Sequence, residues 1–292
     1  GNYETAIADF SKALDINPQF AEAFGNRGNA FLDLGNYETA IADFTKALDI
    51  NPQFAEAYNN RGTAYLDLGN YETAIADFSK ALDINPRLAE AFGNRGVAYA
   101  KSGNLEAAIA DFTKAIEINP QYVNSYYNRG VAYAKSGNYE TAIADYTKAL
   151  EINPQYVNSY YNRGVAYAKS GNYETAIADF SKALDINPEY AEAYNNRGTA
   201  YLDLGNYEMA IVDFSKALDI NHQFAEAYNN RGTAYLDLGN YETAIDDFTK
   251  ALDINPQYAE AYYNRGLAYA KSGDSDKAVN DLKKAKELGL DQ

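Results

Sequence analysis

Apolar residues recur along this chain at steps of three and four, in short blocks that come in pairs. In the block 55–68 the recurring positions are Tyr58, Gly62 and Tyr65. In the block 71–84 they are Ala74, Ile75, Phe78, Ala81 and Leu82. This spacing places the residues of each block on one face of an α-helix. The pattern therefore predicts two amphipathic helices joined by a very short turn.

Glycine and proline mark the ends of these blocks throughout the chain. One glycine column has a spacing of 34 residues and comprises Gly1, Gly35, Gly69, Gly103, Gly137, Gly171, Gly205, Gly239 and Gly273. A second column comprises Gly28, Gly62, Gly96, Gly130, Gly164, Gly198, Gly232 and Gly266. The prolines form a third column at Pro18, Pro52, Pro86, Pro120, Pro154, Pro188 and Pro256, whose other places hold His222 and Leu290. Glycine and proline are the strongest local breakers of regular structure, so the columns divide the chain into repeated helical hairpins.

The residues at the two turns of a hairpin support this division. Asn70 follows the turn glycine Gly69, at the place where a helix N-cap is expected. Pro86 follows the second helix, and the residue before a proline avoids the helical conformation. A hairpin of this size has too little core to fold alone, so the repeat predicts a solenoid in which stacking supplies the stability. Each aromatic ring buried by stacking contributes about 1.5–3 kcal/mol.

The repeated positions resemble the signature of the tetratricopeptide repeat (TPR) family. In one unit they are Tyr58, Gly62, Tyr65, Ala74, Phe78, Ala81 and Pro86. The resemblance implies an all-α fold: an α-solenoid of 34-residue helix-turn-helix repeats that forms a right-handed superhelix, with the first helix of each repeat on the concave surface. One departure is constant, because the family's usual Leu before the glycine is replaced by Arg27, Arg61, Arg95, Arg129, Arg163, Arg197, Arg231 and Arg265.

The repeat also predicts the organisation of the chain. Residues 1–20 are the second helix of a truncated first repeat, residues 21–258 are seven full repeats, and residues 259–292 are an eighth repeat that caps the C-terminal end. The capping repeat adds the lysines Lys277, Lys283, Lys284 and Lys286. At the other end we expect an uncovered flank on Ile7, Phe10 and Leu14, and a further repeat upstream or an end contact that covers it.

Composition narrows the functional classes. The formal net charge of −16 argues against non-specific nucleic-acid binding and against anionic membrane surfaces. No apolar run approaches the length of a membrane span. The chain has no Cys, hence no disulfide, thiol nucleophile or Cys-based metal site, and this does not fix the compartment. We predict no cofactor and no metal site. An enzyme is not expected either, because a reaction centre needs a unique set of residues and this chain offers repeated ones.

The strongest candidate for binding is an unbroken asparagine column. It comprises Asn26, Asn60, Asn94, Asn128, Asn162, Asn196, Asn230 and Asn264. Together with Glu56, Asn59, Thr63 and Asp67, the column should lie on the groove side of the first helix once the apolar face is assigned to the core. An asparagine amide can pair with a peptide N–H and C=O together. The column is similar to the asparagine ladder of some TPR superhelices, which holds an extended peptide by its backbone. The alternative is that these residues bond locally or are invariant through recent duplication.

Two further columns have both a structural and a binding interpretation. Each arginine named above has an aspartate in the second helix of its unit, such as Arg61 and Asp77, and we expect a structural ion pair rather than an anion site. The middle repeats are locally basic and aromatic, with Lys101, Lys135, Lys169, Tyr127 and Tyr161. These residues are candidate groove contacts for a partner, and sequence drift between duplicated blocks is the alternative.

The sequence therefore predicts an interaction scaffold whose partner is a protein or an extended peptide bound along the concave groove. The alternative function is a self-assembling superhelix that stacks end to end through its terminal repeats.

Overall fold

The computed structural model describes residues 2–290, which form helices and turns and no strand. The chain divides into two compact units, with the boundary between Asn153 and Pro154. The first unit contains α1 (Tyr3–Ile16), α2 (Ala21–Asp33), α3 (Tyr37–Ile50), α4 (Ala55–Asp67), α5 (Tyr71–Ile84), α6 (Ala89–Lys101), α7 (Leu105–Ile118), α8 (Val123–Lys135) and α9 (Tyr139–Ile152). The second contains α10 (Val157–Lys169), α11 (Tyr173–Ile186), α12 (Ala191–Asp203), α13 (Tyr207–Ile220), α14 (Ala225–Asp237), α15 (Tyr241–Ile254), α16 (Ala259–Ser272) and α17 (Ser275–Glu287).

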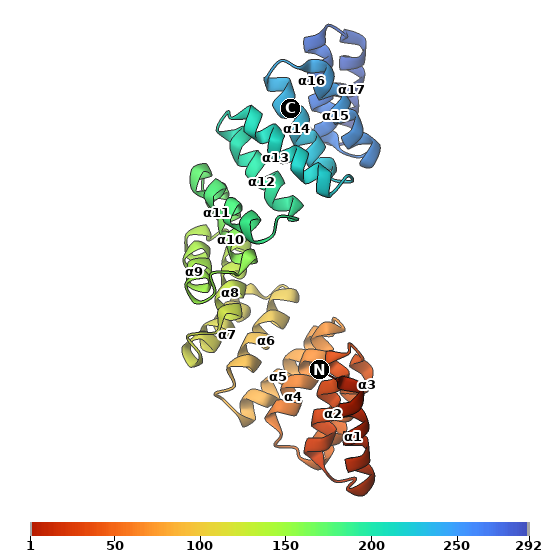
Figure 1. Cartoon of the computed structure of the whole chain (residues 1–292), viewed down its shortest axis with the longest axis vertical. Helices are drawn as coiled ribbons and strands as arrows, with labels where there is room; N and C mark the ends of the chain where they lie inside the picture. The colour runs from red at the N-terminus through yellow and green to blue at the C-terminus, as the bar shows by residue number, and fades with distance from the viewer. Residues whose placement is uncertain (1, 291–292) are drawn as a thin grey trace. The chain divides into compact units, whose positions relative to one another are not determined.

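Within each unit the helices stack as successive hairpins (Figure 1). The even-numbered helices are the first helices of the repeats, and the odd-numbered ones are the second helices. Each first helix packs against the second helix of its own repeat and, inside a unit, against the second helix of the repeat before it. First helices also contact one another, as in the pairs α4 with α6 and α12 with α14, whereas the described second helices do not. The result is the two-layer arrangement of an α-solenoid, with the first helices on one side.

The turn inside each hairpin is closed by backbone hydrogen bonds. Gly69 has a φ of +79°, which side chains rarely allow. The N–H of Asn70 donates to the carbonyl of Tyr65 at 2.8 Å, and the N–H of Gly69 donates to that of Leu66 at 3.0 Å. These two bonds satisfy carbonyl groups at the end of α4 that would otherwise lack a partner.

Asn70 is the N-cap residue of α5, as the sequence predicts. Its side chain makes no cap hydrogen bond, although Asn104 and Asn138 at equivalent positions accept one from the backbone at 3.1 and 3.3 Å. The backbone ψ of Asn70 is 68°, compared with 78° and 73° at Asn104 and Asn138. The side chain of Asn70 is therefore oriented differently relative to the N–H groups of the first turn. The sequence therefore predicts where the helix begins, but not whether the asparagine side chain accepts a hydrogen bond from the first turn.

The turn between repeats depends on asparagine as much as on proline. Asn85 leaves the helical conformation, and its Oδ1 accepts a hydrogen bond from the N–H of Arg87 at 3.1 Å. The turn around His222 has the same geometry without proline, because Asn221 Oδ1 accepts from the N–H of Gln223 at 3.0 Å. An asparagine side chain that bonds two residues ahead mimics a backbone turn.

The core of a hairpin is a ring set against a glycine. Phe78 is fully buried between Ala74 and Ala81, which are also fully buried. A Cβ atom on Gly62 would lie 2.8 Å from Cε1 of Phe78, so no side chain fits there. The backbones of the two helices therefore approach closely at this glycine.

Within a compact unit, the arginine of a repeat joins three helices, as Arg61 shows. Nε and Nη2 of Arg61 donate to Asp77 Oδ2 and Oδ1 at 2.7 and 2.8 Å, and Nη1 donates to Oγ1 of Thr45 at 3.0 Å. Thr45 Oγ1 in turn donates to the carbonyl of Ile41 at 2.7 Å. The guanidinium of Arg61 also lies 5.6 Å from the ring centre of Tyr58. The hydrogen bonds to Asp77 raise the pKa of Arg61.

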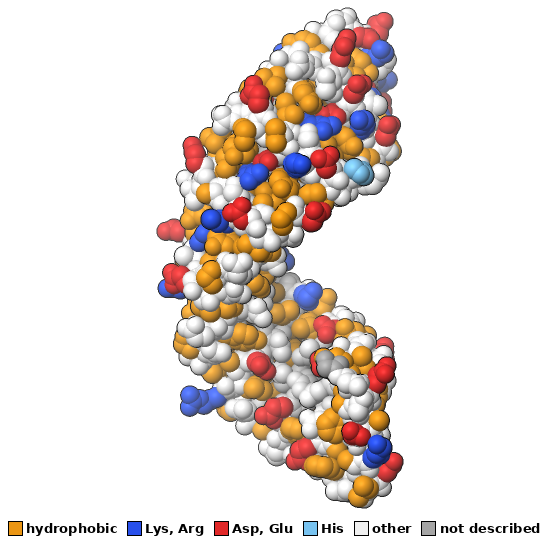
Figure 2. Space-filling model, in the orientation of Figure 1, with side chains coloured by type: hydrophobic (Ala, Val, Ile, Leu, Met, Phe, Trp, Pro, Cys, Tyr) orange, Lys and Arg blue, Asp and Glu red, His pale blue; other side chains and the backbone are white. Residues whose placement is uncertain are grey.

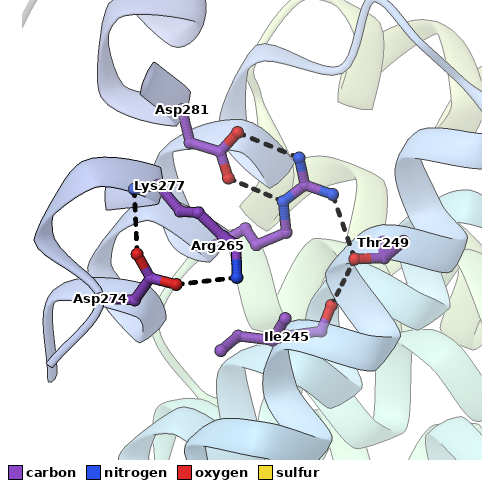
Figure 3. Close-up of polar contacts among 6 residues, drawn as sticks. All are labelled: Ile245, Thr249, Arg265, Asp274, Lys277 and Asp281. Atoms are coloured by element: carbon purple, nitrogen blue, oxygen red, sulfur yellow. Dashed lines mark hydrogen bonds and ion pairs between the residues drawn. The ribbon is translucent and has the colours of Figure 1, made fainter. Parts of the chain in front are cut away.

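The same fork recurs at every repeat, and Figure 3 shows its last copy, in which Arg265 lies between Asp281 and Thr249. The eight carboxylates that accept it are 3–11% exposed: Asp43, Asp77, Asp111, Asp145, Asp179, Asp213, Asp247 and Asp281. The expected structural ion pair is therefore confirmed.

The flank of α1 differs in part from the expectation. Phe10 is only half-buried, whereas its equivalent Phe44 is fully buried. Leu14, however, is 7% exposed, so its predicted exposure is wrong. Ile7 is half-buried like its equivalent Ile41. Phe10 and Leu14 lie one turn apart on the same apolar face of α1, and the contact with α2 buries Leu14 but not Phe10.

The fork predicts a large local loss of stability when one partner is removed. Asp77→Asn leaves the guanidinium of Arg61 without its counter-charge, which should cost about 3 kcal/mol. Because repeat arrays do not always unfold as one unit, the measurement is native-state hydrogen exchange of α4 and α5. Glu72→Gln, an exposed change on the same helix, is the control. Equal exchange in the two variants would contradict the structural role of the fork.

Candidate functional site

Two cavities lie on the side formed by the first helices, one in each unit. The cavity of the first unit has a volume of about 190 Å³ and lies between α6 and α8. The cavity of the second unit has a volume of about 490 Å³ and lies along α10, α12 and α14. Most of the residues around them are equivalent and stand 68 positions apart in the sequence. The predicted groove therefore contains a recurrent hollow between successive first helices.

The cavity of the first unit brings together three of the predicted site residues. Lys101 comes from the last turn of α6, and Asn128 and Lys135 come from α8. Its apolar walls include Val97 and Phe112. Two cations and one amide thus surround a small apolar hollow, an arrangement that suits a carboxylate or another anion.

The cavity of the second unit has mixed charge. Lys169 lies at the end of α10, and the carboxylates of Asp203 and Glu226 face the same space from α12 and α14. Burial raises the pKa of Asp203. The predicted residues Asn196 and Asn230 also line this cavity. The equivalent of Lys135 here is Asp203, so the two cavities differ in the charge that they offer.

Most members of the asparagine column bond to the preceding first helix. The acceptor is a side chain 31 or 35 positions earlier. These bonds run from Nδ2 of Asn60 to Asn29 at 2.7 Å, of Asn94 to Asn59 at 3.2 Å, of Asn196 to the Tyr161 hydroxyl at 2.9 Å, of Asn230 to Asn195 at 3.2 Å and of Asn264 to Asn229 at 3.1 Å. The column therefore links successive first helices, which differs both from a bond within its own helix and from the predicted contact with a peptide.

Asn128 has no such bond, and the sequence explains why. The residues 35 and 31 positions before it are Gly93 and Val97, which have no side-chain acceptor. Of the remaining members, Asn26 is exposed, and Asn162 Nδ2 donates to the carbonyl of Asn158 in its own helix at 2.9 Å. Asn128 is therefore the member that combines an unused side-chain amide with a place in a cavity.

The column that contains Asn59 lies deeper than expected. Asn59 is 5% exposed, so its predicted place in the groove is wrong. Its neighbours in the column face the residue that precedes the next first helix: a Cβ on Gly25 would lie 3.0 Å from Phe54, and one on Gly93 would lie 3.1 Å from Tyr122. The aromatic ring before the next first helix limits the space at the Asn59 column. This limit favours glycine, or a side chain that packs beneath the groove surface.

Tyr127 and Tyr161 belong to the same column and pack in the same way. The ring centre of Tyr127 lies 6.0 Å from that of Tyr146, and the ring centre of Tyr161 lies 6.0 Å from Phe180 and 4.7 Å from Tyr190. Both rings are half-buried, and burial raises the pKa of Tyr161. Their ring faces are thus largely occupied by the protein, and the Tyr161 hydroxyl accepts the bond from Asn196.

On the face shown in Figure 2, acidic and basic side chains lie among hydrophobic and uncharged ones. Residues 2–290 do not bring together three or more His, Cys, Asp or Glu side chains in a way that could hold a metal ion. In the same part of the chain, no helix has both the length and the apolar character needed to cross a membrane.

The chain belongs to the tetratricopeptide repeat family. The model described as "Tetratricopeptide repeat" matches residues 55–88, 123–156, 157–190, 191–224 and 259–288, and another of the same description matches residues 214–246. The model described as "TPR repeat" matches residues 1–35, 28–69, 98–137 and 232–273. No curated protein matches the chain.

Solved structures give the same assignment. The crystal structure of MamA is 31% identical, with a TM-score of 0.52, over 55% of this chain and 93% of that one. YrrB, described as "a TPR protein with an unusual peptide-binding site", is 28% identical, with a TM-score of 0.53, over 63% and 95%. The C-terminal part of a TPR repeat-containing protein from Cytophaga hutchinsonii is 20% identical, with a TM-score of 0.66, over 81% and 97%, and shows the fold alone. The family matches and the likenesses to MamA and YrrB support a protein-interaction scaffold.

The asparagine network predicts a stability effect that is separate from ligand binding. Asn195 is 1% exposed; its Nδ2 donates to Glu226 at 3.2 Å, and its Oδ1 accepts from Asn230 at 3.2 Å. Asn195→Ala should weaken the contact between α12 and α14 by about 1 kcal/mol per lost bond. Faster hydrogen exchange in α14 would show this, with the exposed change Glu192→Ala as the control. Unchanged protection in α14 would mean that solvent replaces the network at no cost.

Proposed function

We propose that the chain is an interaction scaffold that binds an extended peptide across its first helices. In this proposal, an acidic side chain or terminal carboxylate of the peptide enters the cavity of the first unit between Lys101 and Lys135. Asn128 beside them pairs with the peptide backbone. The ligand class is therefore an acidic, extended segment of a partner protein.

The observation that carries the proposal is the unused amide of Asn128. Equivalent asparagines donate to the preceding first helix, and Gly93 and Val97 remove that option here. An amide on a cavity wall, with both donor hydrogens and its acceptor available, can satisfy a peptide N–H and C=O at once.

The positive charge of the cavity in the first unit supports a negatively charged ligand group. The chain carries a net charge of −16, yet this cavity is lined by two lysines and no carboxylate. A carboxylate between them would gain two charge-assisted hydrogen bonds in a partly desolvated place. The acidic surface elsewhere would repel acidic ligands from other positions, which gives selectivity for this one.

Five other candidate residues have supporting roles in this proposal. The cavity of the second unit is lined by Lys169, Asn196 and Asn230. It is also lined by the carboxylates of Asp203 and Glu226, so in this proposal it binds a basic or neutral group of the peptide. Tyr127 and Tyr161 hold the shape of the layer beneath the groove. YrrB is described as having a peptide-binding site, which supports a peptide as the ligand class here.

End-to-end stacking has weaker support than peptide binding. The outer face of α17 carries Val279, Lys283 and Lys286 where internal repeats have Ile, Ser or Thr, and Leu or Ile. All three side chains are exposed. Stacking another repeat there would bury two lysines in place of a hydrogen-bonding hydroxyl and an aliphatic side chain, at a desolvation cost.

Binding of acidic peptides tests the proposal. A library of extended peptides with one central Glu should contain ligands whose Kd rises about tenfold or more in Lys101→Ala, in Lys135→Ala and in Asn128→Ala, each tenfold step being about 1.4 kcal/mol. Lys114→Ala is the matched control, because that lysine is exposed on α7 and pairs with Glu117. Fluorescence anisotropy at two salt concentrations measures these changes, and binding should weaken at the higher one.

The proposal also requires that the ligand charge matters. Replacing the central Glu of the peptide by Gln should weaken binding to the natural chain and have little further effect on Lys101→Ala. Peptides that bind equally well to the natural chain and to the Lys101→Ala and Asn128→Ala variants would contradict it.

A further inference from the structure

One position near the end of each first helix is Leu in half of the full repeats and Ala in the other half. The leucines are Leu32, Leu66, Leu202 and Leu236, and the alanines are Ala100, Ala134, Ala168 and Ala270. Ala100 lines the cavity of the first unit, and Ala168 lines the cavity of the second. Both cavities therefore border on a first helix that has the smaller residue at this position.

The repeats with leucine show what the larger side chain does. Leu66 packs against the cluster formed by Ala74, Phe78 and Ala98. The ring belongs to the second helix of the same repeat, and Ala98 belongs to the first helix of the next repeat. The same packing recurs in the second unit at two further leucines, Leu202 and Leu236. A leucine at this position therefore occupies the space between three helices.

The surface on which this leucine packs is also present at both cavities. Phe112 and Ala132 line the cavity of the first unit, and they are the equivalents of the ring and the alanine that Leu66 contacts. Phe180 and Ala200 hold the same places around the cavity of the second unit. Each cavity thus retains a binding surface for leucine in a repeat that has no leucine of its own there.

The cavity of the first unit separates polar groups from apolar ones. Lys101 and Lys135 are exposed, so a carboxylate held between their ammonium groups stays at the rim. The apolar lining also includes Val97, Leu105 and Val131. The cavity has a volume of about 190 Å³, and an apolar cavity of about 150 Å³ can hold a molecule the size of benzene. An aliphatic side chain therefore fits below the lysines.

We propose that the apolar floor of this cavity is a pocket for a leucine side chain of the partner peptide. The pocket rests on the proposed function and adds a second point of recognition to the acidic group. Alternate side chains of an extended chain point to the same side, so the leucine stands two positions from the acidic residue. In this arrangement Ala100 determines specificity, because its small side chain leaves the pocket open.

A double-mutant cycle between peptide and full chain tests the pocket. The probes are extended peptides with a central Glu that are identical except for Leu or Ala two positions from it, on either side. The better Leu peptide should bind the natural chain more than tenfold more tightly than its Ala counterpart, as measured by fluorescence anisotropy. In Ala100→Leu the pocket is filled from within, so the Leu peptide should lose this advantage while the Ala peptide binds as before.

Ala168→Leu is the matched control, because it makes the same change in the cavity of the second unit. It should leave the affinity of both peptides unchanged. Circular dichroism should show both variants to be folded, since leucine is the natural residue at this position in four repeats. Equal affinity of the Leu and Ala peptides for the natural chain would overturn the proposal. A leucine preference that survives in Ala100→Leu, or that is lost in Ala168→Leu instead, would also overturn it.

An uncharged probe separates this pocket from the charge recognition of the proposed function. N-acetyl-leucine N-methylamide has the leucine side chain and no carboxylate. At millimolar concentrations it should shift the methyl NMR signals of Val97, Val131 and Ala132, and the alanine analogue should not. The shifts should be absent in Ala100→Leu and present in Lys101→Ala.

The outcomes of this titration distinguish the two proposals. Unshifted methyl signals in the natural chain would overturn the leucine pocket even if acidic peptides bind. Shifted signals together with a failure of every acidic peptide to bind would support the pocket and contradict the proposed function alone.

Discussion

The arginine fork is the constraint on which the rest of the structure depends. Arg61 holds the aspartate of its own second helix and the hydroxyl of the second helix before it, so one side chain fixes both the hairpin and the step to its neighbour. Because the fork is bidentate and mostly buried, it tolerates little variation in helix register. The ring of Phe78 on Gly62 then sets how closely the two helices approach. With register and distance fixed, every first helix presents the same positions to the groove.

Such regularity makes departures from the repeat meaningful. The asparagine column is uniform in sequence but not in bonding, because the acceptor of each amide lies in the preceding repeat. Where that repeat offers Asn59 or Asn195, the amide is used within the protein. Where it offers Gly93 and Val97, Asn128 remains available beside Lys101 and Lys135. The function proposed for the groove therefore depends on residues that differ between neighbouring repeats. The fold depends on the residues that all repeats share.

The fold could be predicted almost completely from the sequence, since period, breakers and helical spacing all point to one hairpin. The helix limits and the arginine–aspartate pairing followed from the same columns. The candidate site could be predicted only in part. Asn59 and Tyr161 were expected in the groove because helical geometry gives the direction of a side chain, but not the depth at which the next repeat covers it. Comparing each asparagine with the residues 31 and 35 positions earlier would have identified Asn128.

The side-chain amide resonances of the asparagine column test the central claim most directly. In a nitrogen-edited NMR titration with an acidic extended peptide, the Asn128 amide signals should shift strongly at saturation. Those of Asn94 and Asn264, which are bonded to the preceding helix, should move little. Equal shifts along the whole column would indicate a ligand that displaces the internal network. An unchanged Asn128 signal in the presence of a bound peptide would contradict the account.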